Sequence, residues 1–481
     1  NQQTPQQKET EGALYPMIQI GSIKVAQDDC ESMELSLDSF LPEVIVEIAD
    51  NANKLSDISY PLDGDVLSLY LKPRPMEEYR PIRIDFDIMG ITSIPANPGG
   101  GEEGEEEEKS PAIFTFRGVM RVPLLHADVL QGFAEGNSFD HLLECAEGLG
   151  LGFASNVDGT DDSMARICAQ QTREEFIQQT TLTAYRDDES FFTTYVDFQY
   201  YLCMVNVNQQ FSIEDEMETV TVEPQLDMNL QVGTTAENET EGSLRLSNSQ
   251  EVAGSDMAIA SYNLINNSGA IWYQNGYARK LSYLNLNENN NGGENDGVEE
   301  FLITPLNTPG TEGELIPLRG RMDDEGWDKN NKCKYIGKQS SEDFTNMHSN
   351  YMYAIGQNFA NNDEIQKMIM EVELETVNWS LYRYQRIPVL IYTEGSVNNK
   401  NLENRDSQLG DDKQPKGNDE VEGEEPPNYD DPNQQVKNEF LSGWYVISEM
   451  KYKYNKDTGK IQQSLKLLRR EWPIPGKLKD N

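Results

Sequence analysis

Histidine and cysteine, the side chains that most often carry metal, nucleophilic or acid–base chemistry, are few and scattered in this sequence. The three histidines are His126, His141 and His348, and no two of them have the spacing of metal ligands. No HExxH motif, nucleophile elbow or CxxC pair occurs. We therefore predict no catalytic residue, no metal site and no cofactor.

The cysteines indicate reduced thiols rather than a disulfide framework. There are five of them, an odd number, and they are widely spaced, at Cys30, Cys145, Cys168, Cys203 and Cys333. Small disulfide-stapled proteins instead carry an even number of cysteines at close spacing. We expect most of these thiols to be buried.

Three further segments could carry a ligand, and each also has a structural interpretation. Residues 148–152 (GLGLG) resemble a nucleotide loop but follow a helix instead of a strand, which favours helix termination. Residues 158–162 (DGTDD) offer oxygen ligands for calcium but lack the EF-hand spacing, which favours a turn. The aromatic segment 191–202 could stack on sugars, but its strand periodicity favours a place in the core.

The charge of the chain excludes several function classes. Its 481 residues include 39 Lys and Arg against 83 Asp and Glu, a net charge of −44. Such a surface repels nucleic acid and anionic lipid, so we expect no sequence-specific nucleic-acid binding. No apolar run approaches the roughly 20 residues of a membrane span, so we expect no integral membrane association. Negative walls also suit a DNA conduit. On charge alone, however, the acidic composition is better explained by solubility or by a host with a salty cytoplasm.

Strand periodicity dominates residues 16–124. Apolar and polar residues alternate over 33–38, 44–48 and 82–88, and residues 66–71 and 112–122 complete the pattern. Alternation with a period of two means one buried and one wet face. The acidic segment 99–109 interrupts the last hairpin, so we predict one antiparallel β-domain with an extended loop.

The middle of the chain changes to a mixed pattern. Phe139, Leu142, Leu143 and Ala146 have helical spacing, and Thr172 to Glu175 form a capping box that predicts a second helix. The aromatic and β-branched segment 191–211 predicts a strand. Residues 125–218 therefore form a small α/β domain.

The last part of the sequence returns to β periodicity. We predict a helix over 340–357, strands over 368–374 and 387–392, and a closing hairpin of 443–451 with 461–469. The polar, acidic segments 286–300 and 398–438 bury too little apolar surface to offset chain entropy, so we expect mobile loops there. The residues thus predict a mainly β fold in which two β-domains flank an α/β unit.

Two stretches carry a resemblance to a known family. Residues 114–211, with TFRGVMRVP, the GLGLGFASNVDGTDDSMARI segment and the aromatic strands, look like the middle region of baseplate hub proteins of contractile-tailed bacteriophages, the T4-type hub family. The C-terminal GWYVISEMKYKYNKDTGKIQQSLKLLRREWPIP resembles the closing hairpin of that family. The acidic inserts depart from its pattern.

The resemblance implies an architecture of two tube-type antiparallel β-barrel domains. On it we expect the following division: a flexible N-terminal tail, 1–15; a first tube-like β-domain, 16–124, with the acidic loop 99–109; the α/β domain, 125–218; a connecting segment, 219–260; a second tube-like β-domain, 261–475, with the helix 340–357 and the insert 398–438; and a C-terminal tail, 476–481.

The resemblance also implies a non-enzymatic structural virion protein. A homotrimeric hub of the tail baseplate, assembled in the host cytoplasm, would adapt the sixfold tail tube to the threefold central spike and line the DNA-conducting channel. Its partners would be the central spike, the tail tube or tube-initiator protein, the baseplate wedge proteins and the tape-measure protein. We expect its interface on the strands 82–88, 368–374 and 461–469. Their polar side chains face either the lumen or the solvent: Arg83, Asp85, Asp87, Glu371, Glu373 and Glu375.

Two alternatives stay open at this stage. The chain could be another baseplate component, such as a wedge or tube-initiator protein, for which a single barrel per chain would be the signature. It could also be a cell-wall hydrolase that works through two carboxylates. Among 83 acidic residues the sequence identifies no such pair.

Overall fold

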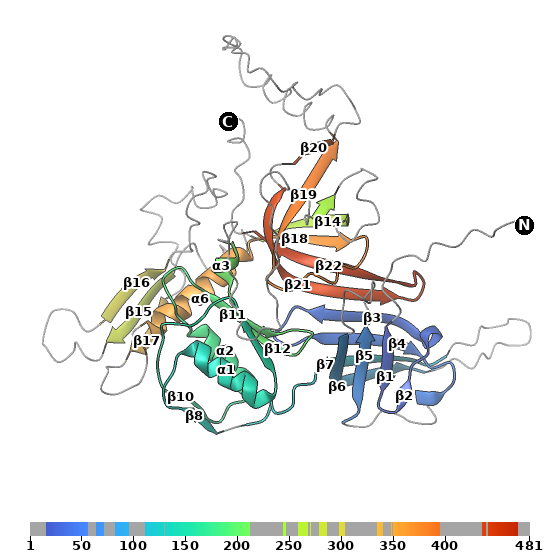
Figure 1. Ribbon diagram of the computed structural model, residues 1–481, viewed down its shortest axis with the longest axis horizontal. Coiled ribbons are helices and arrows are strands. Elements are labelled where there is room, and N and C mark those ends of the chain that lie inside the picture. Colours follow the sequence, from blue (N-terminus) through green and yellow to red (C-terminus); the bar gives the residue numbers. More distant parts are fainter. Residues whose placement is uncertain are drawn as a thin grey trace, which may run out of the picture.

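The computed structural model shows a mainly β molecule in which one large sheet spans both ends of the chain (Figure 1). It describes residues 16–55, 64–71, 82–95, 111–128, 130–211, 244–246, 258–267, 270, 279–285, 298–303, 334–339, 348, 350–394, 435–438 and 441–469. Outside these lie Cys333 and the predicted tails 1–15 and 476–481, loop 99–109, and most of the segments 219–260 and 398–438. The predicted mainly β class is confirmed.

The N-terminal part of the sheet contains seven strands and a short 3₁₀ helix. These are β1 (Met17–Ile20), β2 (Ile23–Lys24), η1 (Gln27–Asp29), β3 (Cys30–Leu37), β4 (Glu43–Ala49), β5 (Val66–Leu71), β6 (Ile82–Ile94) and β7 (Ile113–Met120). Their order is β3-β4-β7-β6-β5-β1-β2, and every neighbouring pair is antiparallel. The alternating sequences therefore form the predicted strands.

The C-terminal part contributes the other seven strands of the sheet. These are β13 (Leu244–Leu246), β14 (Ile259–Asn266), β18 (Met368–Leu374), β19 (Arg386–Glu394), β20 (Gln435–Lys437), β21 (Gly443–Asn455) and β22 (Lys460–Leu468). The hairpin of β21 and β22 turns at residues 456–459, as predicted. Because β21 also pairs with β3, the two predicted β regions form one continuous 14-stranded sheet.

The α/β unit packs beside this sheet. It contains β8 (Gln131–Phe133), α1 (Ser138–Leu149), β9 (Gly152–Ser155), β10 (Arg166–Cys168), α2 (Arg173–Leu182), β11 (Phe192–Val196), β12 (Tyr201–Asn206) and α3 (Val207–Phe211). Strands β11, β12 and β9 form one small sheet, and β8 pairs with β10. Asn137 and Thr172 begin the two main helices as capping-box residues, as their sequences predict.

A third sheet is formed by β15 (Arg279–Asn285), β16 (Val298–Ile303) and β17 (Lys334–Gln339), which lie against α6 (Tyr351–Ile365). Figure 1 shows this group at the far left, next to the α/β unit. No helix in the described part of the chain has the length and hydropathy needed to cross a membrane.

Four sequence predictions need correction. Helix α6 runs from Tyr351 to Ile365 instead of the predicted 340–357, since the described residue His348 lies before the helix and the C-terminal half of the helix is rich in amide side chains rather than apolar ones. Residues 191–211 are two strands followed by the short helix α3, not one strand. Residues 298–300 belong to β16, and residues 435–437 of the acidic insert form β20. In each case pairing or packing with distant residues overrides the local composition.

Candidate functional site

One face of the large sheet is polar across almost its full width. Alternation sends every second side chain of each strand to that face, and cross-strand partners lie on the same face. One row of partners crosses nine strands: Ser261, Glu373, Ser464, Lys451, Ser36, Glu43, Val119, Asp87 and Val66. We call the surface made by this row and its parallel neighbours the polar face.

The opposite face of the sheet is the core side. Leu35, Val46, Phe116 and Tyr452 are among its buried residues. The α/β unit packs on this side, where Phe198, in the turn between β11 and β12, lies 5.7 Å from the ring of Tyr452. At one end of the polar face, Ile369 and Leu468 cluster with Tyr195 of the α/β unit, and the polar side chains lie beyond that end.

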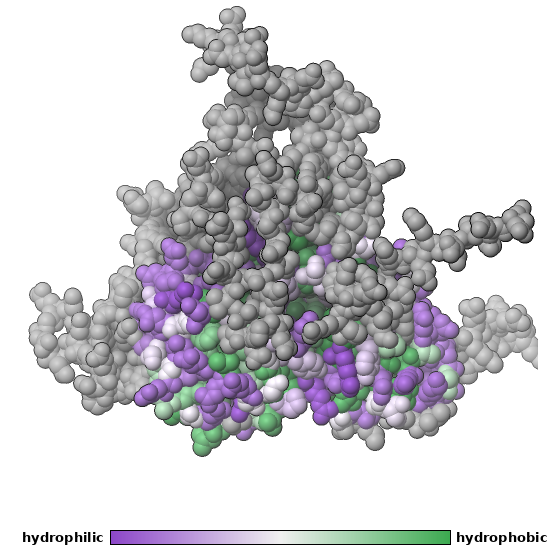
Figure 2. Space-filling view, viewed as in Figure 1, coloured by the Kyte–Doolittle hydropathy of each residue, from purple (hydrophilic) through white to green (hydrophobic). Residues whose placement is uncertain are grey.

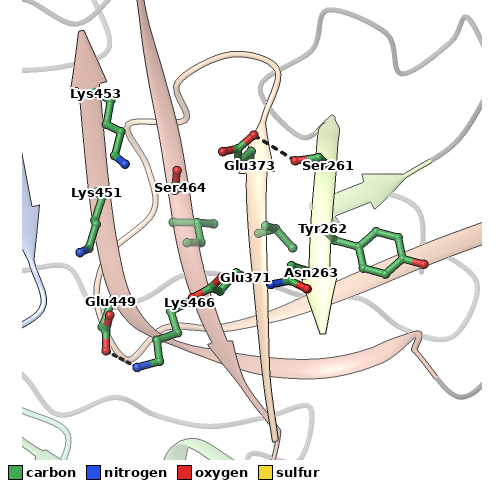
Figure 3. Close-up of a pocket in the computed structure, with 12 residues that line it drawn as sticks. Ser261, Tyr262, Asn263, Glu371, Glu373, Glu449, Lys451, Lys453, Ser464 and Lys466 are labelled. Atoms are coloured by element: carbon green, nitrogen blue, oxygen red, sulfur yellow. Dashed lines mark hydrogen bonds and ion pairs between the residues drawn. The ribbon is translucent and has the colours of Figure 1, made fainter. Parts of the chain in front are cut away.

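The polar face is concave where the C-terminal strands lie. A groove of about 340 Å³ runs across β14, β18, β22 and β21, and its polar lining includes Glu371, Glu373, Lys451 and Lys466. Figure 3 shows these side chains projecting from neighbouring strands into one hollow. The sequence left open which way Glu371 and Glu373 point, and the structure places them in this hollow.

Four basic side chains on the polar face are paired with carboxylates, and three of them lie on the C-terminal strands. Lys451 Nζ lies 3.1 Å from Asp38 Oδ2 and Lys453 Nζ lies 3.4 Å from Glu34 Oε2. Lys466 pairs with Glu449 beside the groove (Figure 3). Burial lowers the pKa of Lys451, but the hydrogen bond and charge of Asp38 outweigh it, so the net shift is upward and the ammonium stays charged.

Carboxylates also outnumber basic groups on this face. Register and alternation place eight acids there, Glu34, Glu43, Glu47, Asp85, Asp87, Glu371, Glu373 and Glu449, and seven bases, Lys24, Arg83, Arg117, Lys451, Lys453, Lys460 and Lys466. The face is thus acidic by one charge, and ion pairs hold four of these seven cations against carboxylates of the same chain.

The junction between β3 and β21 makes the polar face continuous. Their antiparallel register runs from Met450 opposite Leu37 to Asn455 opposite Ser32. Lys456 Nζ adds an ion pair to Glu31 Oε1 at 2.6 Å, at the end of the junction. Sequence periodicity did not identify this pairing, because it joins strands more than 400 residues apart.

Arg383 fastens the same junction from the core side. Its guanidinium donates to the backbone oxygens of Ser448 in β21 and Ser39 after β3, both at 2.6 Å. It also lies over the Tyr195 ring of the α/β unit, 4.9 Å from the centroid, and the Tyr195 hydroxyl donates to the Arg383 carbonyl. At 8% exposure, Arg383 joins three parts of the molecule. Sequence reasoning missed it, and only its place in a buried strand-rich segment could have indicated it.

The strands predicted to carry an interface are internal in this chain. Residues 82–88 lie between β5 and β7, 368–374 between β14 and β22, and 461–468 between β18 and β21. Their backbone groups pair on both sides, so any contact they make with another molecule is through side chains. The ends of the main strand path are instead β14 and β2.

The predicted polar side chains divide between the two halves. Arg83, Asp85 and Asp87 lie on the N-terminal half of the polar face, and Glu371 and Glu373 lie on the C-terminal half. Glu375 is exposed just beyond the end of β18, where its backbone N–H donates to the carbonyl of Ala258.

The segments weighed as ligand sites have structural roles. Gly150 ends α1 in the left-handed conformation, with φ of 72°, as the helix-termination interpretation predicts. The rings of Phe191, Phe192 and Tyr195 are buried in the core. None of the four cysteines that the structure describes forms a disulfide, and all four are buried; burial raises the pKa of Cys145 to about 12, which favours the neutral thiol.

Asp162 lies at the centre of a buried polar network. Its carboxylate accepts from the backbone N–H of Ser138 at 2.9 Å, from the Thr160 hydroxyl at 2.6 Å and from the Ser138 hydroxyl. Arg166 lies 3.7 Å away and donates to Ser138 and to Nδ1 of His141. Burial lowers the pKa of His141, consistent with a neutral ring that accepts from the guanidinium. The network fixes the start of α1 and carries no nucleophile geometry.

The histidines do not come together as a metal site. His126 is exposed and pairs with Glu174 at 3.2 Å, whereas Nε2 of the buried His348 lies 3.1 Å from the Thr183 carbonyl. Within the ranges that the structure describes, no three His, Cys, Asp or Glu side chains are grouped to hold a metal ion.

No protein family model matches the chain, and no curated protein matches its sequence. Several solved structures are similar to it. A tail protein from Neisseria meningitidis MC58 has 7% identity and a TM-score of 0.46, with 96% of this chain and 100% of that chain covered. The 43 kDa tail protein of prophage MuSo2 from Shewanella oneidensis has 9% identity and a TM-score of 0.49, with 95% and 98% covered.

A third similar structure is the Escherichia coli c3393 protein, a type VI secretion component described as similar to bacteriophage T4 tail proteins. Its identity is 8% and its TM-score 0.39, with 95% of this chain and 79% of that chain covered. Because all three TM-scores are below 0.5, we base the functional proposal on the chain's own contacts. The similar structures are thus two tail proteins and a type VI secretion component, all at low sequence identity.

Proposed function

We propose that this protein is a structural component of a phage tail, a homotrimeric baseplate hub whose polar sheet face lines the channel through which DNA passes. The observation that carries the proposal is the β3–β21 junction, which turns two β regions into one sheet with an unbroken, partly concave polar face. The resemblance of residues 114–211 and of the closing hairpin to the hub family supports the same role.

The charges of the polar face suit a surface that DNA passes without binding. DNA binds proteins chiefly when free Lys and Arg replace the counterions of its phosphates. On this face carboxylates outnumber bases by eight to seven, and Lys451, Lys453 and Lys466 are already paired with carboxylates. Where these pairs lie, phosphates would meet neutral pairs rather than free cations.

The ends of the sheet supply the surfaces for ring closure. Strand β14 ends the path on one side, and its eight residues, IASYNLIN, carry no charge and no proline. No strand in the described part of the chain is hydrogen-bonded to its outer side, and natural proteins usually protect an open edge with charges or prolines, so this edge favours pairing. In a closed ring, the β14 edge of each copy would face the β1–β2 end of the next, a heterologous contact.

A ring of three such chains would present six β regions to the sixfold tail tube and three copies to the threefold central spike. The partners in this proposal are the spike, the tube or tube-initiator protein, the wedge proteins and the tape-measure protein, in the virion tail after assembly in the host cytoplasm. The proposed role is non-enzymatic, because joining a sixfold tail tube to a threefold spike requires contact surfaces and no chemical reaction.

The first test is the solution mass of the purified chain at moderate salt, measured by light scattering. A mass near three times 54.5 kDa supports the hub, and a mass near six times that value indicates a tube or wedge component instead. A chain that stays monomeric alone and with the purified spike protein overturns the proposal.

A further inference from the structure

The β8–β10 ribbon presents an apolar outer face that nothing in the described part of the chain covers. Leu130 is 83% exposed and Ile167 is 68% exposed, although both are large aliphatic side chains. Ile167 lies directly opposite Gly132, and Leu130 is two residues before Gly132, so all three share one face of the ribbon. We call this surface the ribbon face.

The inner face of the same ribbon is well packed. Phe133 is 4% exposed and stacks on Phe176 of α2 at 5.0 Å, and Cys168 is 2% exposed. A substitution on the outer face therefore leaves the core contacts in place. Gly132 has open space where a side chain would be, with no atom within 4 Å, so the ribbon face is accessible between its two aliphatic residues.

The surroundings of the ribbon face are strongly acidic. Residues 124–175 contain ten acids and two basic residues, Arg166, which is buried beside Asp162, and Arg173, whose charge acts on the Cys168 thiol of the ribbon. Eight of the acids are exposed: Asp128, Glu135, Asp140, Glu144, Glu147, Asp158, Asp161 and Glu175. Glu144 lies at the ribbon itself, because it accepts from the side chain of Gln131 at 2.9 Å.

This combination selects the chemistry of a partner. Exposed aliphatic side chains gain from burial, at about 25 cal/mol per Å² of apolar surface, which favours any apolar contact. The acidic surroundings repel an acidic partner, including a second copy of this chain with its charge of −44. A basic partner would gain from both effects and would be steered to the site at low salt.

We propose that the ribbon face is a docking site for a basic partner protein that inserts apolar side chains over Leu130 and Ile167 and places lysines or arginines against the surrounding carboxylates. The site lies on the α/β unit, whereas the polar face lies on the large sheet. Figure 2 shows apolar surface at the foot of the α/β unit, next to hydrophilic residues. The proposal does not depend on the channel role of the sheet.

The test uses the full chain and a seven-residue probe peptide that alternates lysine and leucine. We expect the peptide to slow hydrogen exchange at residues 130–133 and 166–168, with an affinity that weakens as salt increases. A peptide alternating lysine and serine tests for binding by charge alone, and one alternating glutamate and leucine tests for binding by apolar contact alone. Both should bind at least about tenfold more weakly.

Matched variants separate the two contributions. Leu130→Ser with Ile167→Ser should weaken binding of the lysine–leucine peptide about tenfold or more. Met89→Ser changes a similarly exposed apolar site, at 70% exposure on β6, and should leave binding unchanged. Glu135→Gln with Glu144→Gln should reduce the dependence of peptide binding on salt concentration. Thermal melting of each variant, expected to match that of the parent chain, shows that the fold is kept.

Three results would overturn the proposal. The first is that the peptide slows hydrogen exchange at segments other than the ribbon. The second is that the variant with Leu130→Ser and Ile167→Ser binds the peptide as tightly as the parent chain. The third is that raising the concentration of the chain alone slows exchange at the ribbon, which would mean self-association. The solution mass of the chain tests the hub independently, so failure of one proposal is distinguishable from failure of the other.

Discussion

At the scale of single residues, Arg383 connects the two β regions and the α/β unit at one point. Its bonds to the carbonyls of Ser39 and Ser448 satisfy backbone groups on both sides of the β3–β21 junction. A planar guanidinium can reach several acceptors at once, which an ammonium cannot do in the same geometry. The stability of the junction therefore depends on this side chain more than on any exposed ion pair.

Arg383→Met should lower the free energy of unfolding by about 3 kcal/mol, because it leaves buried carbonyls without donors. Arg383→Lys should restore only part of the loss. Urea titration followed by tyrosine and tryptophan fluorescence measures both. Arg83→Met is the control, since Arg83 is 59% exposed and its ion pair with Asp85 contributes little. Equal effects of the Arg83 and Arg383 variants would contradict the role of Arg383.

Asp197 gives the protein a specific pH dependence. Burial raises the pKa of this carboxyl from its ordinary 3.8 to about 6, although two backbone N–H groups donate to it. The folded protein then binds a proton that the unfolded chain has released between pH 4 and pH 6. Stability should fall as the pH rises through this window, by at most about 3 kcal/mol.

Asp197→Asn should remove this part of the pH dependence and stabilise the protein at pH 7, because the amide oxygen still accepts both bonds. Unfolding midpoints at pH 4, 5, 6 and 7 measure the effect. Asp457→Asn, an exposed site in the turn between β21 and β22, serves as the control. If the unfolding midpoints of the Asp197 variant and the parent chain change in parallel with pH, this pH dependence does not come from Asp197.

At the scale of elements, close packing between neighbouring strands fixes where glycine is required. A Cβ at Gly118 in β7 would lie 2.9 Å from Cβ of Phe86 and 3.2 Å from a methyl carbon of Val44. Gly90 in the adjacent strand β6 has no atom within 4 Å of the same position. The two glycines thus form a natural pair for comparison.

Gly118→Ala should destabilise the sheet by about 1–3 kcal/mol through overpacking, whereas Gly90→Ala should change stability by less than about 0.5 kcal/mol. Thermal unfolding of the two variants beside the parent chain measures the difference. A neutral Gly118→Ala would show that β6 and β7 separate easily and that the core side of the sheet is looser than its contacts indicate.

Local patterns in the sequence predict elements well where one face is buried and one is wet. The alternation in β3, β4, β6 and β18 and the capping boxes at Asn137 and Thr172 all correspond to observed elements. The predicted bounds of helix α6 were wrong because amides, Gln357, Asn358 and Asn361, make up part of its buried surface. Asn358 donates to the carbonyls of Leu182 and Ala184 and accepts from the backbone N–H of Phe192, so a polar side chain joins α6 to the α/β unit.

The candidate site could be predicted only in part. Alternation identified the outward side chains of 82–88 and 368–374, but not their common surface, since register between strands leaves no trace in local periodicity. The same limit hid the β3–β21 junction and Arg383. The ribbon face was also missed, because Leu130 and Ile167 look like ordinary core residues until exposure is known.

At the scale of the whole molecule, the uncharged edge strand β14 should control assembly rather than folding. Ser261→Lys with Asn263→Lys places two cations on this exposed edge and should convert a trimer into monomers, with a melting temperature within a few degrees of the parent. Thr92→Lys, an exposed site on the internal strand β6, is the control and should leave the mass unchanged. Light scattering measures the solution mass of both variants. A trimer that persists after the double substitution would mean that the contact between subunits lies away from β14.

The pairing of β3 with β21 also has a consequence for how the chain is made. Glu31 and Lys456, which close this junction, are separated by 425 residues, so β3 keeps an open strand edge until the residues between them have been synthesised. Contacts of such long range form slowly and expose unpaired edges in the meantime. Fragments that end before β21 would therefore keep this edge of the N-terminal sheet unpaired, and we expect them to aggregate more readily than the full chain.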